Sequence, residues 1–208
     1  MRNYLFLLSL CLLSWSARAQ TERGSKLLGL AAGNFTYTDL SGPDYDLTGS
    51  LYPSVGWFVA DRLALGTELR FSYERSRSGY LSVDGPIVRT SRVWGLGLAP
   101  FVRYYLVDAS KHKLFGQASG EYTRYLQRNT TEEVGRRTYG NSFGYDGSGW
   151  FAGVGYNYFV SPNVALEARA GYRRDRQNSF IGIGGQGSLD VRLGFSVFLL
   201  PGQGLKGN

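Results

Sequence analysis

The chain has 208 residues, with 23 Lys and Arg against 16 Asp and Glu, 29 glycines, one cysteine and one histidine. The length suits one domain, and no Pro-rich, Ser-rich or single-charge stretch marks a linker. Since Cys11 lies in an N-terminal apolar run, the rest of the chain is left with no thiol. This excludes disulfides, thiolate zinc sites and cysteine nucleophiles there, and no metal or cofactor is expected.

The first residues have the features of a secretory signal. A basic start at Arg2 precedes an apolar run over residues 4–13, and the small-residue site Ala-Arg-Ala at 17–19 precedes Gln20. The run is much shorter than the ~20 residues of a membrane-spanning helix. We therefore predict a signal peptide over 1–19 and one domain over 20–208. Removing two arginines with the signal leaves a net charge of 21 − 16 = +5. An exported basic protein meets lipid phosphates before nucleic acid, so no nucleic-acid partner is expected.

Segments with apolar residues at every second position recur along the remaining chain, and long helical periodicity is missing. In chain order they span residues 26–38, 47–59, 62–74, 92–106, 113–128, 150–160, 163–173 and 187–200. The alternation is clearest in the last segment, where Leu189, Val191 and Leu193 share one face. It breaks in the first segment near Gly33-Asn34, which indicates a β-bulge. The pattern predicts eight strands.

The connections alternate in length. Short turns at 60–61, 107–112 and 161–163 separate hairpin partners, while longer segments, including loops over 129–145 and 173–187, join the other strand ends. Short turns and long loops therefore lie at opposite ends. Outer-membrane barrels have this arrangement, with short periplasmic turns, long extracellular loops and both termini in the periplasm.

Aromatic residues on the apolar face fall near the strand ends. Those at the long-loop ends are Tyr73, Trp94, Tyr122, Trp150 and Tyr172, and those at the short-turn ends are Trp57, Tyr104 and Tyr158. At about 3.3 Å per residue and a tilt near 40°, the segment from Trp94 to Tyr104 separates the two girdles by roughly 25 Å, the height of a membrane band. A soluble lipocalin-like barrel would bury its apolar face and imposes no such spacing. We therefore predict an all-β fold, an eight-stranded antiparallel up-and-down transmembrane β-barrel.

The opposite face carries charges of both signs: Glu68, Arg70, Glu74, Arg103, Glu121, Glu167, Arg169, Arg173, Asp190 and Arg192. An Arg facing lipid at mid-membrane costs about 2–4 kcal/mol, so these residues must face the barrel interior. Two interpretations stay open, a salt-bridged closed core and a gated ion path.

Further arginines fall at strand tips and in the long loops: Arg75, Arg77, Arg89, Arg92, Arg124, Arg128, Arg136, Arg137, Arg174 and Arg176. Outer-membrane lipid, and lipopolysaccharide phosphates in particular, are their expected partners through bidentate hydrogen bonds. The alternative is a set of solvated loop charges with no particular partner.

Two stretches carry a family resemblance. They are Pro-Ser-Val-Gly-Trp-Phe-Val at 53–59 running into Arg-Leu-Ala-Leu-Gly at 62–66, and Pro-Phe-Val-Arg-Tyr-Tyr at 100–105 running into Lys-Leu-Phe at 113–115. The chain resembles the OmpA-like or porin-type eight-stranded outer-membrane β-barrel proteins, especially small ones of Bacteroidota. The resemblance implies the Gram-negative outer membrane, insertion by the barrel assembly machinery, and a monomer. The strand ending at Phe198 resembles the terminal assembly signal of such barrels, but Leu199-Leu200 and the 201–208 tail depart from it.

Three functional classes remain. We favour a structural barrel with extracellular contacts to lipopolysaccharide or surface ligands, and a narrow porin-like diffusion channel for small solutes or ions is the alternative. A lipid-modifying enzyme is the third class. Because a deacylase needs a His beside a Ser at the outer rim, and His112 lies in a short turn at the opposite end, no enzymatic activity is expected.

Overall fold

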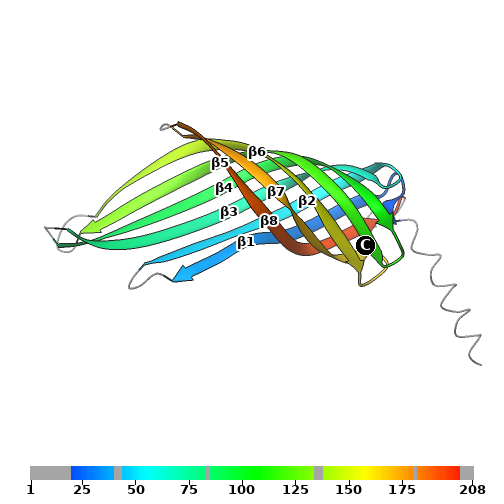
Figure 1. Ribbon diagram of the computed structural model, residues 1–208, viewed down its shortest axis with the longest axis horizontal. Helices are drawn as coiled ribbons and strands as arrows, with labels where there is room; N and C mark the ends of the chain where they lie inside the picture. Colours follow the sequence, from blue (N-terminus) through cyan, green and yellow to red (C-terminus); the bar gives the residue numbers. More distant parts are fainter. Residues whose placement is uncertain (1–19, 40–43, 83–84, 134–137, 180–181, 202–208) are drawn as a thin grey trace, which may run out of the picture.

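The computed structural model describes residues 20–39, 44–82, 85–133, 138–179 and 182–201. Its strands are β1 (Lys26–Asp39), β2 (Tyr45–Ala60), β3 (Leu63–Ser82), β4 (Gly85–Asp108), β5 (His112–Glu133), β6 (Tyr139–Phe159), β7 (Val164–Ser179) and β8 (Gly182–Leu199). Each strand pairs antiparallel with the next, and β8 pairs with β1, so the sheet closes into a barrel (Figure 1). The prediction of eight up-and-down strands is confirmed. The predicted signal peptide at 1–19 lies outside the described residues.

Within the described residues, no helix has the length and apolar character needed to cross a membrane.

Side-chain alternation separates the two faces of the sheet. In β4, buried positions from Gly95 to Tyr105 alternate with exposed ones from Trp94 to Tyr104. The outward positions are mainly Leu, Val and aromatic residues, which suit contact with lipid. The inward positions are glycines, aromatic rings and charges. At the end with the short turns, the interior is filled by an apolar cluster: Leu27, Phe58, Ala64, Tyr105, Phe115, Phe159, Ala165 and Phe198.

The strands at the opposite end are longer than the sequence pattern predicts. Most of the predicted 129–145 loop belongs to β5 and β6, and most of the predicted 173–187 loop belongs to β7 and β8. In Figure 1, β3 to β6 continue as a projecting sheet well past the closed part of the barrel. The prediction was wrong because it followed apolar alternation, which ends where lipid contact ends. Backbone hydrogen bonding between strands does not require apolar alternation, so the strands continue beyond that point.

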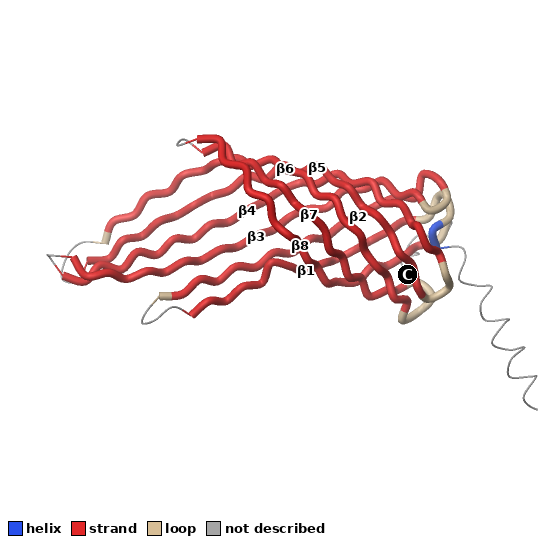
Figure 2. Tube along the Cα trace, in the orientation of Figure 1, coloured by secondary structure: helices blue, strands red, loops and turns tan. Residues whose placement is uncertain are grey.

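The seam between β1 and β8 is short. It runs from Lys26 opposite Leu199 to Gly33 opposite Arg192, and the remainder of β8 pairs only with β7. The β1–β2 register shifts between Gly33 and Thr36, and Asn34 has a positive φ of 55°. This confirms the predicted bulge. Beyond it, the β1–β2 and β7–β8 hairpins diverge (Figure 2).

Candidate functional site: the charged interior and the arginine rim

A chain of alternating charges crosses the barrel interior. Its members, in order of contact, are Arg70, Glu121, Arg173, Asp190, Arg192, Glu68 and Arg169. Arg173 Nη1 is 3.2 Å from Asp190 Oδ2, and Arg192 Nε is 2.6 Å from Asp190 Oδ1. The chain links β3, β5, β7 and β8 across the lumen, because inward residues of distant strands meet at the axis of so narrow a barrel.

A second charged layer lies toward the apolar cluster. Arg103 and Glu167 form a bidentate pair, with Nη1–Oε2 and Nη2–Oε1 distances of 2.8 and 3.0 Å. Arg103 Nε donates to Gln117 at 2.9 Å, and the Asn157 amide and the Ser196 hydroxyl donate to Glu167 at 3.1 and 2.6 Å. A buried pair is tolerated when such hydrogen bonds satisfy its remaining atoms.

Aromatic rings and glycines complete the packing of these layers. The Arg103 guanidinium lies 4.0 Å from the Phe115 ring centroid, and that of Arg192 lies 3.6 Å from the centroid of Tyr52. Phe115 occupies the space beside Gly155, where an added Cβ would come within 2.1 Å of the ring. In both layers, buried charged and aromatic side chains from distant strands thus pack against one another inside the barrel.

One residue of the predicted charge set is not buried, and three charged residues were missed. Glu74 is on the inward face of β3 but is exposed, because it lies beyond Arg70 along the strand, outside the buried charged layers. Asp175 takes its place, 3.1 Å from Arg173 Nε. Sequence reasoning missed Asp175 because it was assigned to a loop. It also missed the buried Lys113–Asp108 pair at the turn end.

All eight girdle residues lie on the outward face. Seven of them have large exposed side chains, and Tyr73 is half-buried. Tyr73 packs against Trp94 at a ring-centroid distance of 4.4 Å, and Trp150 against Tyr172 at 5.7 Å. Amphipathic rings of this kind are typical of the level of lipid headgroups.

An arginine rim lies directly above the girdle at the long-strand end. We use this name for the outward arginines Arg75, Arg77, Arg92, Arg124, Arg128, Arg174 and Arg176. Arg75, Arg92 and Arg128 are register partners on three adjacent strands, two residues beyond the Tyr73–Trp94 pair on the same face. The Arg75 guanidinium also lies 5.4 Å from the Tyr45 ring centroid, and the Nε atoms of Arg75 and Arg77 are buried with no hydrogen-bond partner among the described residues.

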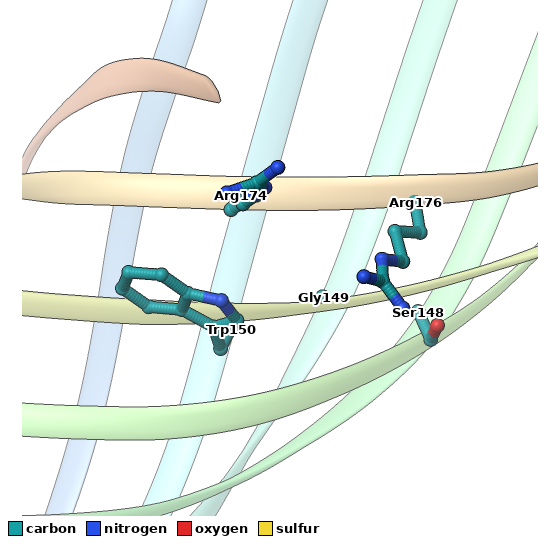
Figure 3. A pocket seen from close by; sticks show the side chains of 5 residues that line it. All are labelled: Ser148, Gly149, Trp150, Arg174 and Arg176. Atoms are coloured by element: carbon teal, nitrogen blue, oxygen red, sulfur yellow. The ribbon is translucent and has the colours of Figure 1, made fainter. Parts of the chain in front are cut away.

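The rim contains a hollow between β6 and β7. A cavity of about 430 Å³ is lined by Ser148, Gly149, Trp150, Arg174 and Arg176. Arg174 is the register partner of Trp150, and Arg176 that of Ser148. Figure 3 shows the two guanidinium groups on β7 beside the indole and the serine on β6. The arrangement offers two cations and an aromatic face to one ligand.

The other predicted contact residues fall elsewhere. The rim arginines belong to strands, although the sequence analysis placed them at tips and in loops. Arg89 faces the inside of the projecting sheet, and Arg136 and Arg137 lie outside the described residues.

His112 begins β5 directly after the predicted short turn, and its exposed ring contacts Tyr156 and Tyr158. Among the described residues, no cluster of His, Cys, Asp and Glu is suited to hold a metal ion.

Comparisons with known proteins address this architecture. No protein-family model matches the sequence, and no curated protein matches it. Solved structures do match. A major outer membrane protein from Thermus thermophilus is 16% identical, with 84% of this chain and 99% of that chain covered and a TM-score of 0.50. This chain has the outer-membrane β-barrel fold.

Two more barrels of this fold match at lower TM-scores. The N-terminal β-barrel domain of Pseudomonas aeruginosa OprF is 16% identical over 86% of this chain and 98% of its own, with a TM-score of 0.39. Neisserial surface protein A is 20% identical over 84% and 96%, with a TM-score of 0.40. The outer-membrane β-barrel fold carries several activities, so function must be argued from the sites.

Proposed function

We propose that the protein is a structural barrel of the Gram-negative outer membrane, with a closed interior and a rim that binds lipopolysaccharide phosphates. The observation that carries the proposal is the row of Arg75, Arg92 and Arg128 above the girdle. Register partners on adjacent strands are about 5 Å apart, and like charges at that distance destabilise a sheet. A bound polyanion turns this repulsion into attraction.

The height of the row favours a lipid phosphate as that anion. Tyr73 and Trp94 lie two residues below it on the same face, and aromatic girdles of this kind stand at the membrane interface. Guanidinium groups bind phosphate oxygens in bidentate geometry. The hollow with Trp150, Arg174 and Arg176 offers the same chemistry on another part of the rim.

The contacts in the interior favour a closed scaffold rather than a diffusion channel. A conducting path would have to separate ion pairs whose Arg and Glu side chains are at most 10% exposed. Breaking such pairs costs several kcal/mol. We expect no reproducible single-channel steps from the refolded protein in planar bilayers, and regular steps would contradict a closed interior.

The proposal includes an orientation and partners. The rim faces the cell exterior and both termini face the periplasm, as short turns and an even strand number favour. The barrel assembly machinery inserts the chain as a monomer. No catalytic role is assigned to any residue.

Lipopolysaccharide binding tests the rim directly. The variant R75Q/R92Q/R128Q removes the row, and its control R23Q/K26Q/K111Q removes three exposed cations at the opposite end. We expect purified lipopolysaccharide, titrated into refolded protein in detergent micelles, to bind the rim variant at least about tenfold more weakly, because several charge-assisted hydrogen bonds are lost.

The control variant should bind as the unmodified protein does, and dephosphorylated lipopolysaccharide should bind all three proteins weakly. Equal affinities of the two variants, or binding that does not depend on phosphate, would refute the proposal.

A further inference from the structure

The projecting sheet has two chemically different faces. Its outer face carries the rim arginines of β3, β4 and β5. On the inner face, register rows run across β4, β5 and β6: Gly95, Tyr125 and Tyr145; Val93, Gln127 and Phe143; Ser91, Asn129 and Asn141; Arg89, Thr131 and Tyr139. The outer face is therefore cationic, whereas the inner face is mainly uncharged, polar and aromatic.

A cavity of about 490 Å³ opens on this inner face, above the closed layers. Its lining residues are Arg89, Ser91, Gln127, Asn129, Thr131, Tyr139, Gly140 and Asn141. The size is within the usual range of ligand sites, about 300–1,000 Å³. The lining is rich in amides and hydroxyls, with a single charged side chain.

The amides are oriented by contacts with their neighbours. Gln127 Nε2 donates to Ser91 Oγ at 3.2 Å and to Asn129 Oδ1 at 3.0 Å. Both Asn129 and Gln127 are half-buried, while Asn141 and Arg89 are exposed toward the opening. The cavity wall thus presents both donors and acceptors, and the Gln127 amide is held in place by its two neighbours.

Three aromatic rings lie on the same inner face, in the register rows between the cavity and the charged layers. Tyr125 and Tyr145 stack with centroids 5.0 Å apart and planes at 18°, and Phe143 lies 6.3 Å from Tyr145. Burial raises the pKa of the Tyr145 phenol, and the neighbouring Tyr125 and Glu74 raise it further. The phenol therefore stays protonated at neutral pH and keeps its O–H donor.

From this lining we propose that the inner face binds a small glycan, neutral or carrying a single carboxylate. Sugar hydroxyls both donate and accept hydrogen bonds, as amides and hydroxyls of the wall require. The apolar C–H face of a sugar ring suits an aromatic ring such as Tyr139, which lines the cavity. One arginine, Arg89, matches one carboxylate, whereas a polyphosphate would find no further cation among the described residues that line the cavity. This site is separate from the rim.

A printed glycan array of neutral and acidic oligosaccharides, probed with fluorescently labelled refolded protein, tests the proposal. The variant N129A/N141A removes two paired amides from the inner face. Its control T130A/S142A removes polar side chains from the same two strands on the outer face. We expect at least one glycan to bind the unmodified and control proteins, and N129A/N141A to bind it on the order of tenfold more weakly.

Three further measurements sharpen the outcome. All variants are first shown to be folded by their gel migration before and after boiling. R89Q should lose acidic glycans and keep neutral ones, and R75Q/R92Q/R128Q should keep both, which separates this site from the rim. An array with no bound glycan, or binding that N129A/N141A leaves unchanged, overturns the proposal.

Discussion

Glu121 is the residue on which two interior arginines depend. Its carboxylate pairs with both Arg70 and Arg173, and its side chain is 5% exposed. Arg173 keeps Asp175 and Asp190 when Glu121 is removed, whereas Arg70 has no other ion pair among the described residues. A buried guanidinium without its carboxylate is costly, since it has lost its water as well.

We therefore expect Glu121→Ala to lower the free energy of unfolding by about 3 kcal/mol. Glu74→Ala is the matched control, because Glu74 faces the same interior but is exposed, and it should change the value by less than about 0.5 kcal/mol. Urea unfolding in lipid vesicles measures both. Equal effects of the two substitutions would show that the ion pair does not stabilise the barrel.

At the scale of the elements, β1 and β8 have the shortest pairing in the barrel. Gly33 is the last β1 residue of the seam, and a Cβ there would come within 2.8 Å of the Val191 carbonyl oxygen and 3.1 Å of Arg192 Cγ. The strands can approach this closely only because the position has no side chain.

Gly33→Val should weaken the seam and lower the free energy of unfolding by about 1–3 kcal/mol, the usual cost of overpacking. Gly116→Val provides the control, since nothing lies within 4 Å of a Cβ at this outward position of β5. The folded fraction is read from gel migration without boiling as urea is raised. A seam variant that resists urea as well as the control does would contradict this role of Gly33.

At the scale of the whole molecule, the barrel has two unlike ends. One end has the short turns and the other has the projecting sheet (Figure 1). The apolar cluster fills the interior at the first end, and the arginine rim lies at the second. The proposed orientation places the second end outside the cell.

Cysteine labelling tests that orientation in a Gram-negative host. Ser142 is exposed on the projecting sheet, Lys111 lies in a turn, and Leu98 is outward at mid-barrel. A membrane-impermeant maleimide should label Ser142→Cys on intact cells and Lys111→Cys only after the outer membrane is opened. Leu98→Cys should stay unlabelled within lipid, and the unmodified protein reports the background. Labelling of Lys111→Cys on intact cells would reverse the proposed orientation.

The sequence by itself determined the strand number, the two faces, the girdles and most of the interior charges. A membrane requires apolar residues at every second position of a strand between its two interfaces, and this alternation can be recognised from neighbouring residues in the sequence. The bulge at Asn34 could be predicted for the same reason, because the apolar alternation is interrupted there.

Only the tertiary structure decided where pairing continues beyond the lipid and which charges meet. Strand extension past Glu74 and Arg128 depends on backbone hydrogen bonds, which leave no apolar pattern. The choice of Asp175 over Glu74 depends on register and on where the lumen closes. The rim and the inner cavity likewise exist because closing the barrel brings distant strands into rows, and no local stretch of sequence contains that information.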